Sequence, residues 1–304
     1  MKITFFPVLA LFMFVSSDIS QGPFFIASSH AAADQSSAIS SKKPEEKQWL
    51  ASLASLLNKD NPGNDIFPLA EALASNSQLR ELALKRFKNG TNNKEVSLLL
   101  RILTSTRDPE IQQTAFLWAS SKEDTQARIR GFDLLASMPP SPKINQIALN
   151  EIFRDKETPA LPYAIQTLRR FDIPTPDETN KVVSRMHELT LHSDPHIRGA
   201  SLQVLSEWDR AKHYLEESIL RLLKDDKPYV RYSVLAAMVT ADIRSEEVKR
   251  QLFELLADSK TRDELRFAIL SQFRRFPLTQ AEYDRFRAVR DKLVNQAVRQ
   301  SKDS

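Results

Sequence analysis

The sequence predicts an all-α protein, an α-solenoid in which helix pairs stack one on another. Three observations predict this fold class. Apolar residues recur at i, i+3, i+4 and i+7 in segments of about 11 to 20 residues, and no segment shows the alternation typical of a strand. The chain has only 5 glycines against 16 prolines, which favours helices separated by sharp turns. Finally, one motif repeats along the chain at intervals of roughly 35 residues.

The N-terminal segment, residues 1–33, has the pattern of a secretory signal peptide. Lys2 precedes an apolar run, Ile3–Val15, which is too short to span a bilayer as a helix. Small residues around Ala31–Ala33 suit a cleavage site, although the run could also act as an uncleaved anchor. We therefore expect an exported protein, periplasmic in a Gram-negative host and otherwise secreted, without a transmembrane span after signal removal. The absence of cysteine excludes a disulfide framework and thiolate metal sites.

The next segment, residues 34–47, is polar and rich in serine, which predicts a flexible linker. The folded domain is expected to cover residues 48–304, starting near Trp49. The 41% apolar content of the whole chain is enough for a substantial core.

Three segments, 194–202, 227–235 and 262–270, align in one register. Each has an aliphatic residue followed by arginine, a small residue two positions after that arginine and a leucine four positions after it. Weaker copies lie upstream, so that the aliphatic positions of all copies are Leu79, Ile111, Leu161, Ile197, Val230 and Leu265. The interval between the second and third copies is too long for one helix pair, and we expect it to hold an additional helix, Thr125–Ser137.

A partner helix is expected before each helix that carries the motif, because a pair of about 35 residues must stack on its neighbours to bury its apolar face. The expected partners are Lys94–Thr104, Ile144–Phe153, Glu178–Leu191, Leu215–Leu223 and Glu246–Leu256. A long C-terminal helix, Thr279–Arg299, is expected to cap the stack.

The motif resembles the second helix of HEAT repeats, most clearly at 194–205 and 227–238. The resemblance covers roughly residues 65–275 and implies about six helix pairs with one extra helix and the C-terminal cap. Two copies depart from the pattern, with Gln112 and Pro162 in place of arginine. In HEAT proteins this arginine commonly pairs with an acidic turn residue of the next repeat. The resemblance therefore implies a structural ladder of arginines and aspartates, here Arg198, Arg231, Arg266, Asp194, Asp226 and Asp263, with Arg80 in a weaker copy.

Three histidines, His187, His192 and His196, lie within ten positions and raise the question of a metal site. A zinc-binding helix needs histidines at i and i+4, whereas His187 and His192 are five apart. Between His192 and His196, Asp194 is a good N-cap and Pro195 a good first helical residue. We interpret the stretch as the join between two helices and predict no metal, cofactor or catalytic residue.

An enzyme remains the alternative interpretation, because HEAT-like folds include metal-dependent hydroxylases and enzymes that attach or detach bilins. The hydroxylases carry several His-Glu pairs, and this sequence has one. The sequence also shows no glycine-rich phosphate loop, nucleophile elbow or Ser/His/Asp set.

Basic residues recur at the ends of helices, at Lys85–Phe87, Arg169–Phe171 and Arg274–Phe276. With the C-terminal helix, they predict a basic edge that binds a partner and includes Arg274, Arg275, Arg285, Arg287 and Arg290. The expected partner is a protein or peptide in the cell envelope, or else an anionic envelope polymer. The export signal and the net charge of only +4 argue against nucleic acid. A non-catalytic scaffold with an extended binding surface is the expected function.

Overall fold

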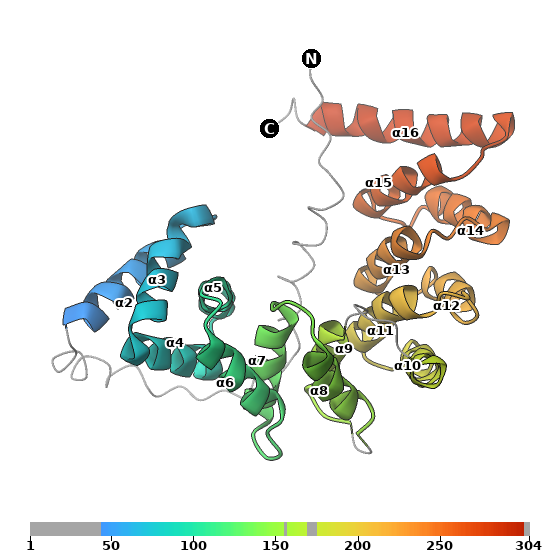
Figure 1. Ribbon diagram of the computed structural model, residues 1–304. Helices are drawn as coiled ribbons and strands as arrows, with labels where there is room; N and C mark the ends of the chain where they lie inside the picture. Colours follow the sequence, from blue (N-terminus) through green and yellow to red (C-terminus); the bar gives the residue numbers. More distant parts are fainter. Residues whose placement is uncertain (1–43, 155–156, 169–174, 301–304) are drawn as a thin grey trace. The chain divides into compact units, whose positions relative to one another are not determined.

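A computed structural model describes residues 44–154, 157–168 and 175–300 of the chain (Figure 1). These residues form α-helices and short 3-10 turns, with no strand among them. The helices fall into two compact units, of which the first ends at Thr167 and the second begins at Leu168. Within each unit helices pack on one another in succession, so the chain has the all-α solenoid fold that the sequence predicts. The expected signal peptide and most of the expected linker lie outside the described residues.

The first unit contains eight α-helices and one 3-10 turn in its described residues. They are α2 (Pro44–Leu57), η1 (Gly63–Ile66), α3 (Phe67–Ser75), α4 (Ser77–Asn89), α5 (Asn93–Ser105), α6 (Pro109–Ala119), α7 (Thr125–Ala136), α8 (Pro142–Ile152) and α9 (Leu161–Thr167). Helix α2 starts inside the segment 34–47 that was expected to be a linker. Pro44 supplies a favourable first helical residue, and Glu45 and Glu46 complement the positive helix terminus.

The second unit contains seven α-helices and one 3-10 turn in its described residues. They are α10 (Pro176–Leu189), α11 (Pro195–Trp208), α12 (Leu215–Leu222), α13 (Pro228–Ala241), α14 (Glu246–Ala257), α15 (Asp263–Gln272), η2 (Phe273–Arg275) and α16 (Gln280–Gln300). The partner helices and the C-terminal helix thus lie within a few residues of their predicted bounds. None of the helices in the described ranges is long and apolar enough to cross a membrane.

Most of these helices begin at a short polar residue whose side chain accepts hydrogen bonds from the first turn. Such caps satisfy amide groups that have no partner inside the helix. The capping residues are Asn76, Asn92, Asp108, Asp124, Ser141, Thr175, Asp194 and Ser245. Helices α13 and α15 differ, because their N-cap residues, Lys227 and Arg262, make no capping hydrogen bond.

The helix predicted as an insertion, here α7, is a full member of the first unit. It packs along α6 and also contacts α4, α5 and α9. Gly131 permits this approach, since a Cβ atom at that position would lie 2.3 Å from the backbone nitrogen of Ala119. Helix α6 pairs with α7 rather than with α5, so the prediction that Ile111 marks the second helix of a pair with Lys94–Thr104 was wrong. The sequence of the copy at Ile111 also departs from the motif, because it has Gln112 in place of arginine.

The second unit is built on contacts between the helices that carry the repeated motif. Helix α13 packs between α11 and α15. Gly199 of α11 lies against the side chains of Tyr229 and Ser233, on α13. At the C-terminal end, α16 packs on α15, and its Leu293 is buried. Beyond Leu293 the described side chains of α16 are exposed.

Candidate functional site

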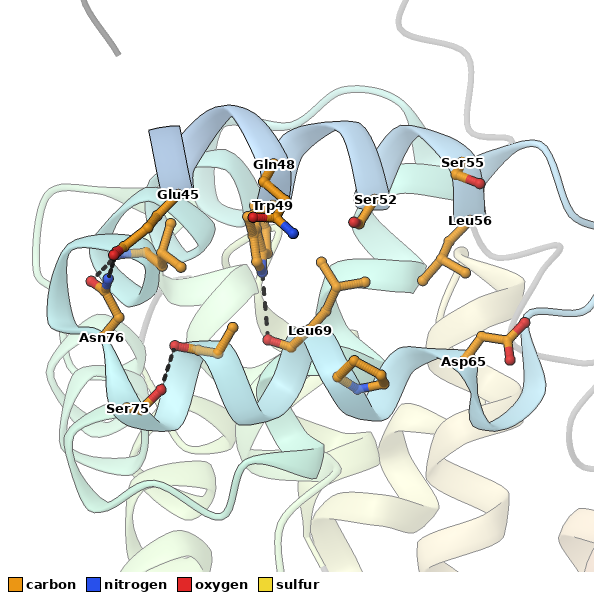
Figure 2. Close-up of a pocket in the computed structure, with 13 residues that line it drawn as sticks. Glu45, Gln48, Trp49, Ser52, Ser55, Leu56, Asp65, Leu69, Ser75 and Asn76 are labelled. Atoms are coloured by element: carbon orange, nitrogen blue, oxygen red, sulfur yellow. Dashed lines mark hydrogen bonds between the residues drawn. The ribbon is translucent and has the colours of Figure 1, made fainter. Parts of the chain in front are cut away.

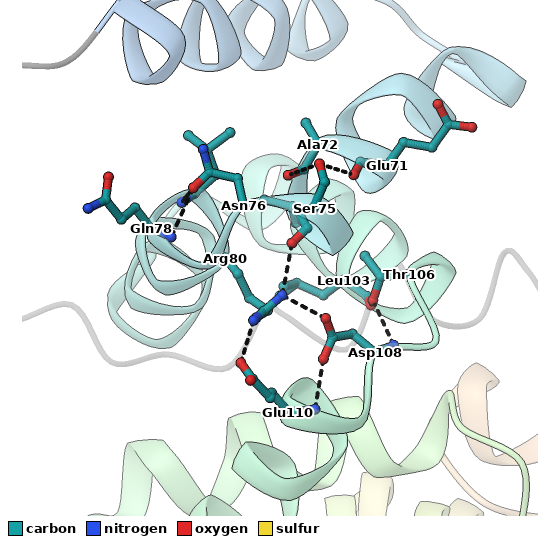
Figure 3. A network of polar contacts seen from close by, with 12 residues as sticks. Glu71, Ala72, Ser75, Asn76, Gln78, Arg80, Leu103, Thr106, Asp108 and Glu110 are labelled. Atoms are coloured by element: carbon teal, nitrogen blue, oxygen red, sulfur yellow. Dashed lines mark hydrogen bonds and ion pairs between the residues drawn. The ribbon is translucent and has the colours of Figure 1, made fainter.

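In several copies of the repeated motif, the arginine ties the two helices of a pair together. In α4, the guanidinium of Arg80 donates a hydrogen bond to the carbonyl of Leu73, near the end of α3, at 3.1 Å. The same group pairs with Asp108, the N-cap of α6, at 2.7 Å, and also with Glu110 (Figure 3). Because Arg80 and Asp108 are both nearly buried, the pair is shielded from solvent. The cation therefore satisfies a free carbonyl at one helix end and joins α4 to the next turn.

Arg128 of α7 makes the equivalent contacts, although it does not belong to any of the motif copies recognised in the sequence. Its Nη1 donates to the carbonyls of Ser121 and Lys122, just after α6, both at 3.0 Å. Its Nε lies 3.9 Å from the buried carboxylate of Glu151. The sequence contains part of the motif at this place, because Asp124 lies four residues before Arg128, just as Asp194 lies four residues before Arg198. This copy was missed because Ala127 replaces the expected aliphatic residue.

Arg198 of α11 makes the most complete set of these contacts. It donates to the carbonyls of His192 and Ser193 at 2.9 and 2.8 Å. It also donates two hydrogen bonds to the carboxylate of Asp225, at 2.8 and 2.9 Å. Asp226, the partner proposed from sequence, lies 3.7 Å away and is largely exposed.

The other predicted ladder residues behave differently. Asp194 caps α11 through the amide of His196, and Arg266 pairs with Asp263 inside α15, at 2.9 Å. Arg266 also donates to the carbonyl of Asp258 at 2.6 Å. The side chain of Arg231 makes no ion pair or hydrogen bond within the described residues, and its Nε is buried. The turn before α15 explains this, because it carries Lys260, Thr261 and Arg262 where the turn before α13 carries Asp225, Asp226 and Lys227.

The three histidines lie where one helix ends and the next begins. Helix α10 ends at Leu189 and α11 starts at Pro195, as the sequence predicts. The Nδ1 of His192 accepts a hydrogen bond from the amide of Asp194 at 2.9 Å, which fixes the turn. His187 stacks on Tyr214, and His196 lies against Tyr229, with ring centroids 4.5 and 5.1 Å apart.

These ring contacts join α10 to the start of α12 and α11 to α13. His187 and His196 thus hold consecutive helix pairs together. Within the described residues no three His, Asp or Glu side chains are grouped as metal ligands.

The predicted basic edge is only partly free to bind a partner. Arg275 is half-buried and pairs with Asp242 at 2.5 Å. Hydrogen bonds from Arg244 and then from Arg275 hold the pKa of Asp242 below its ordinary value. Arg290 pairs with Asp291 at 2.8 Å.

The other three members of the edge are exposed, at η2 and on α16. Arg274 is exposed, Arg285 lies 4.9 Å over the ring centroid of Phe253, and Arg287 lies 3.7 Å from Asp291. Of the other two recurrences, Lys85–Phe87 belongs to the first unit, and Arg169–Phe171 lies outside the described residues. The described part of the edge is therefore confined to the C-terminal end of the second unit.

A groove lies between α2 and α3, in the first unit (Figure 2). It has a volume of about 710 Å³. Its lining residues are Glu45, Gln48, Trp49, Ser52, Ser55, Leu56, Asp65, Pro68, Leu69, Ala72, Ser75, Asn76 and Leu79. None of them is predicted as a site residue from the sequence, because no motif marks α2 or α3 and the motif position Leu79 is predicted only to pack in the core.

The groove has an apolar floor between two polar rims. Trp49, Leu56 and Leu69 are buried, and the indole Nε1 of Trp49 donates to the carbonyl of Leu69 at 3.4 Å. One end is closed by Asn76, whose amide donates to Glu45 at 2.8 Å. At the other end Asp65, which is exposed, pairs with Lys59 at 2.6 Å. A site of this size and composition suits a ligand that is partly apolar and has polar groups to fix its orientation.

No family model matches the sequence, and no curated protein matches it significantly. Among solved structures, the chain is similar to the X-ray structure of the YibA protein of Escherichia coli, a target of structural genomics. The two chains are 18% identical, and the alignment covers 71% of this chain and 76% of the other, with a TM-score of 0.51. At this identity the similarity concerns the fold, and it supports the all-α solenoid.

Proposed function

We propose that the mature chain is an exported, non-catalytic scaffold of HEAT-like repeats that binds a protein or peptide partner in the cell envelope. The groove between α2 and α3 is the observation that carries this proposal, because it offers an apolar floor and polar rims between two helices. The structural contacts of residues that could have been read as ligands of a metal or an anion support it as well. His187 and Arg198, for example, are engaged in joining one helix pair to the next.

The second candidate is an anionic envelope polymer bound at the C-terminal end. The exposed cations Arg274, Arg285 and Arg287 favour it. Reversing the charge of Arg285 and Arg287 tests this candidate without breaking the Arg275–Asp242 pair. Loss of polymer binding with unchanged helicity would support it, and unchanged binding would exclude this edge.

The scaffold proposal is tested by crosslinking in living cells with the full-length protein, tagged at its C-terminus. We expect the tagged protein in the envelope fraction, with its N-terminus starting near residue 34, crosslinked to one or a few envelope proteins. The metal content of the same purified material is measured in parallel. Stoichiometric metal without a protein partner would overturn the scaffold proposal in favour of the enzyme alternative.

A further inference from the structure

The groove between α2 and α3 has a charge that selects its ligand. Its lining includes two carboxylates, Glu45 and Asp65, and no lysine or arginine. Both acidic residues are exposed. Glu45 accepts a hydrogen bond from the neutral amide of Asn76, whereas Asp65 pairs with Lys59 at 2.6 Å, so a basic group of the ligand would replace Lys59 there. We propose that the groove binds an extended peptide segment that carries apolar residues and at least one lysine or arginine. This inference rests on the proposed function and specifies its partner.

The dimensions of the groove suit an extended chain. Its α2 wall runs from Glu45 to Leu56, which at about 1.5 Å per residue corresponds to roughly 16 Å. An extended peptide rises about 3.3 Å per residue, so about five residues span this length. Apolar side chains of the peptide would lie on Trp49, Leu56 and Leu69, while its basic side chains would reach the carboxylates at the two ends.

The rim also offers hydrogen-bonding groups to a peptide backbone. Ser52 and Ser55 are exposed on the α2 rim, and their hydroxyls make no hydrogen bond within the described part of the chain. The hydroxyl of Ser75, in contrast, already donates to the carbonyl of Glu71. An extended peptide has free amide and carbonyl groups along both edges, which hydroxyl groups can pair with.

The test is a binding titration with the chain from residue 34 to residue 304 and three fluorescein-labelled hexapeptides. In these peptides leucine alternates with lysine, with glutamate or with serine. The net charge of the whole protein, +4, favours the glutamate peptide through long-range attraction. Selectivity for the lysine peptide must therefore arise locally, and we expect it to bind at least about tenfold more tightly than the glutamate peptide.

Three variants locate the binding. Ser52→Trp fills the groove, and we expect it to abolish binding of the lysine peptide while the circular dichroism spectrum stays unchanged. The double variant Glu45→Gln, Asp65→Asn should weaken binding about five- to tenfold, as expected for two exposed ion pairs. Glu71→Gln is the matched control, because Glu71 is an exposed acid of α3 outside the groove lining. This variant should bind the lysine peptide as tightly as the wild type does. The inference would be overturned if all variants bound the lysine peptide as tightly as the wild type does. It would also be overturned if the wild type bound the glutamate peptide as tightly as the lysine peptide.

Crosslinking in cells separates this inference from the scaffold proposal. If the Ser52→Trp variant captures the same partner as the wild type, the groove is not the docking site and the scaffold proposal stands. If the wild type captures no partner, the scaffold proposal fails, while the titration still shows whether the groove binds a basic peptide. Sedimentation of the protein alone tests whether a second copy of the chain occupies the groove. If the wild type forms a dimer and the Ser52→Trp variant is a monomer, the peptide assignment is overturned.

Discussion

Arg198 of α11 holds the carboxylate of Asp225 with two hydrogen bonds, although the two residues belong to different helix pairs. The same guanidinium donates to the carbonyls that follow α10. One side chain therefore connects the end of one helix, the start of the next and the turn of the following pair. Both partners are largely buried, with side-chain exposures of 13% and 7%, so solvent screens their attraction weakly.

Removal of either partner is expected to destabilise the second unit. Arg198→Met or Asp225→Asn leaves a buried polar group without its partner, and we expect a loss of about 2–4 kcal/mol in the free energy of unfolding. Urea denaturation followed by circular dichroism measures the loss. Asp226→Asn is the control, since Asp226 is 71% exposed and lies farther from Arg198, and its effect should stay below about 0.5 kcal/mol. A loss for Asp226→Asn as large as that for Asp225→Asn would contradict the assignment.

Two glycines in helix interfaces predict a graded response to alanine. At Gly131 the added Cβ would meet backbone atoms of Ala119 and Ala115, so α6 and α7 would have to separate. At Gly199 it would meet side-chain atoms of Tyr229 and Ser233, which can move. We expect Gly131→Ala to cost at least about 2 kcal/mol and Gly199→Ala no more than about 1 kcal/mol, because alanine's better helix propensity offsets the smaller clash. Equal midpoints in urea would show that the α6–α7 contact does not need glycine.

The sequence predicts the fold well because the fold depends on local patterns. Apolar spacing, capping residues and prolines place most helix bounds within a few residues, and Asp194–Pro195 correctly marks the join after α10. The pairing of helices is harder to predict, since it depends on distant contacts. Gly131 brings α7 against α6, and nothing in the local pattern names Ala119 as its neighbour.

The candidate site is less predictable for the same reason. Basic residues such as Arg275 and Arg290 are easily recognised in the sequence. Whether they can bind a partner depends on their ion pairs with Asp242 and Asp291, which only the structure shows. The groove escapes notice because most of its lining positions are ordinary serine, leucine and alanine residues, on α2, α3 and the start of α4. Only the packing of α2 on α3 gives them a common surface.

The start of α16 predicts a dependence of stability on pH. Glu282 accepts a hydrogen bond from the amide of Thr279 at 2.7 Å, and Lys249 pairs with the same carboxylate. These contacts lower the pKa of Glu282, with the backbone hydrogen bond as the largest cause. A carboxylate with a lowered pKa stabilises the fold above its unfolded pKa of about 4.3 and loses this effect as the pH falls through the folded pKa.

Glu282→Gln should therefore lower the melting temperature at pH 7, and its difference from the wild type should shrink as the pH falls below about 4. Thermal unfolding followed by circular dichroism between pH 3 and pH 7 measures the difference. Glu71→Gln, on an exposed face of α3, should match the wild type at pH 7. A deficit of Glu282→Gln that stays constant down to pH 3 would show that the charge of Glu282 is not responsible.

Arg231 offers the complementary experiment, because it occupies the position of Arg198 without an acidic partner. Arg231→Met should change the free energy of unfolding by less than about 0.5 kcal/mol, in contrast to Arg198→Met. Lys260 aligns with Asp225 in the repeat, so Lys260→Asp should create the missing pair and stabilise the protein by about 0.5–1 kcal/mol. The gain should disappear in the Arg231→Met background, which a double-mutant cycle in urea measures directly. If Lys260→Asp gives the same gain with and without Arg231, the gain comes from removing repulsion among Lys260, Arg262 and their neighbours, and the ladder does not extend to α13.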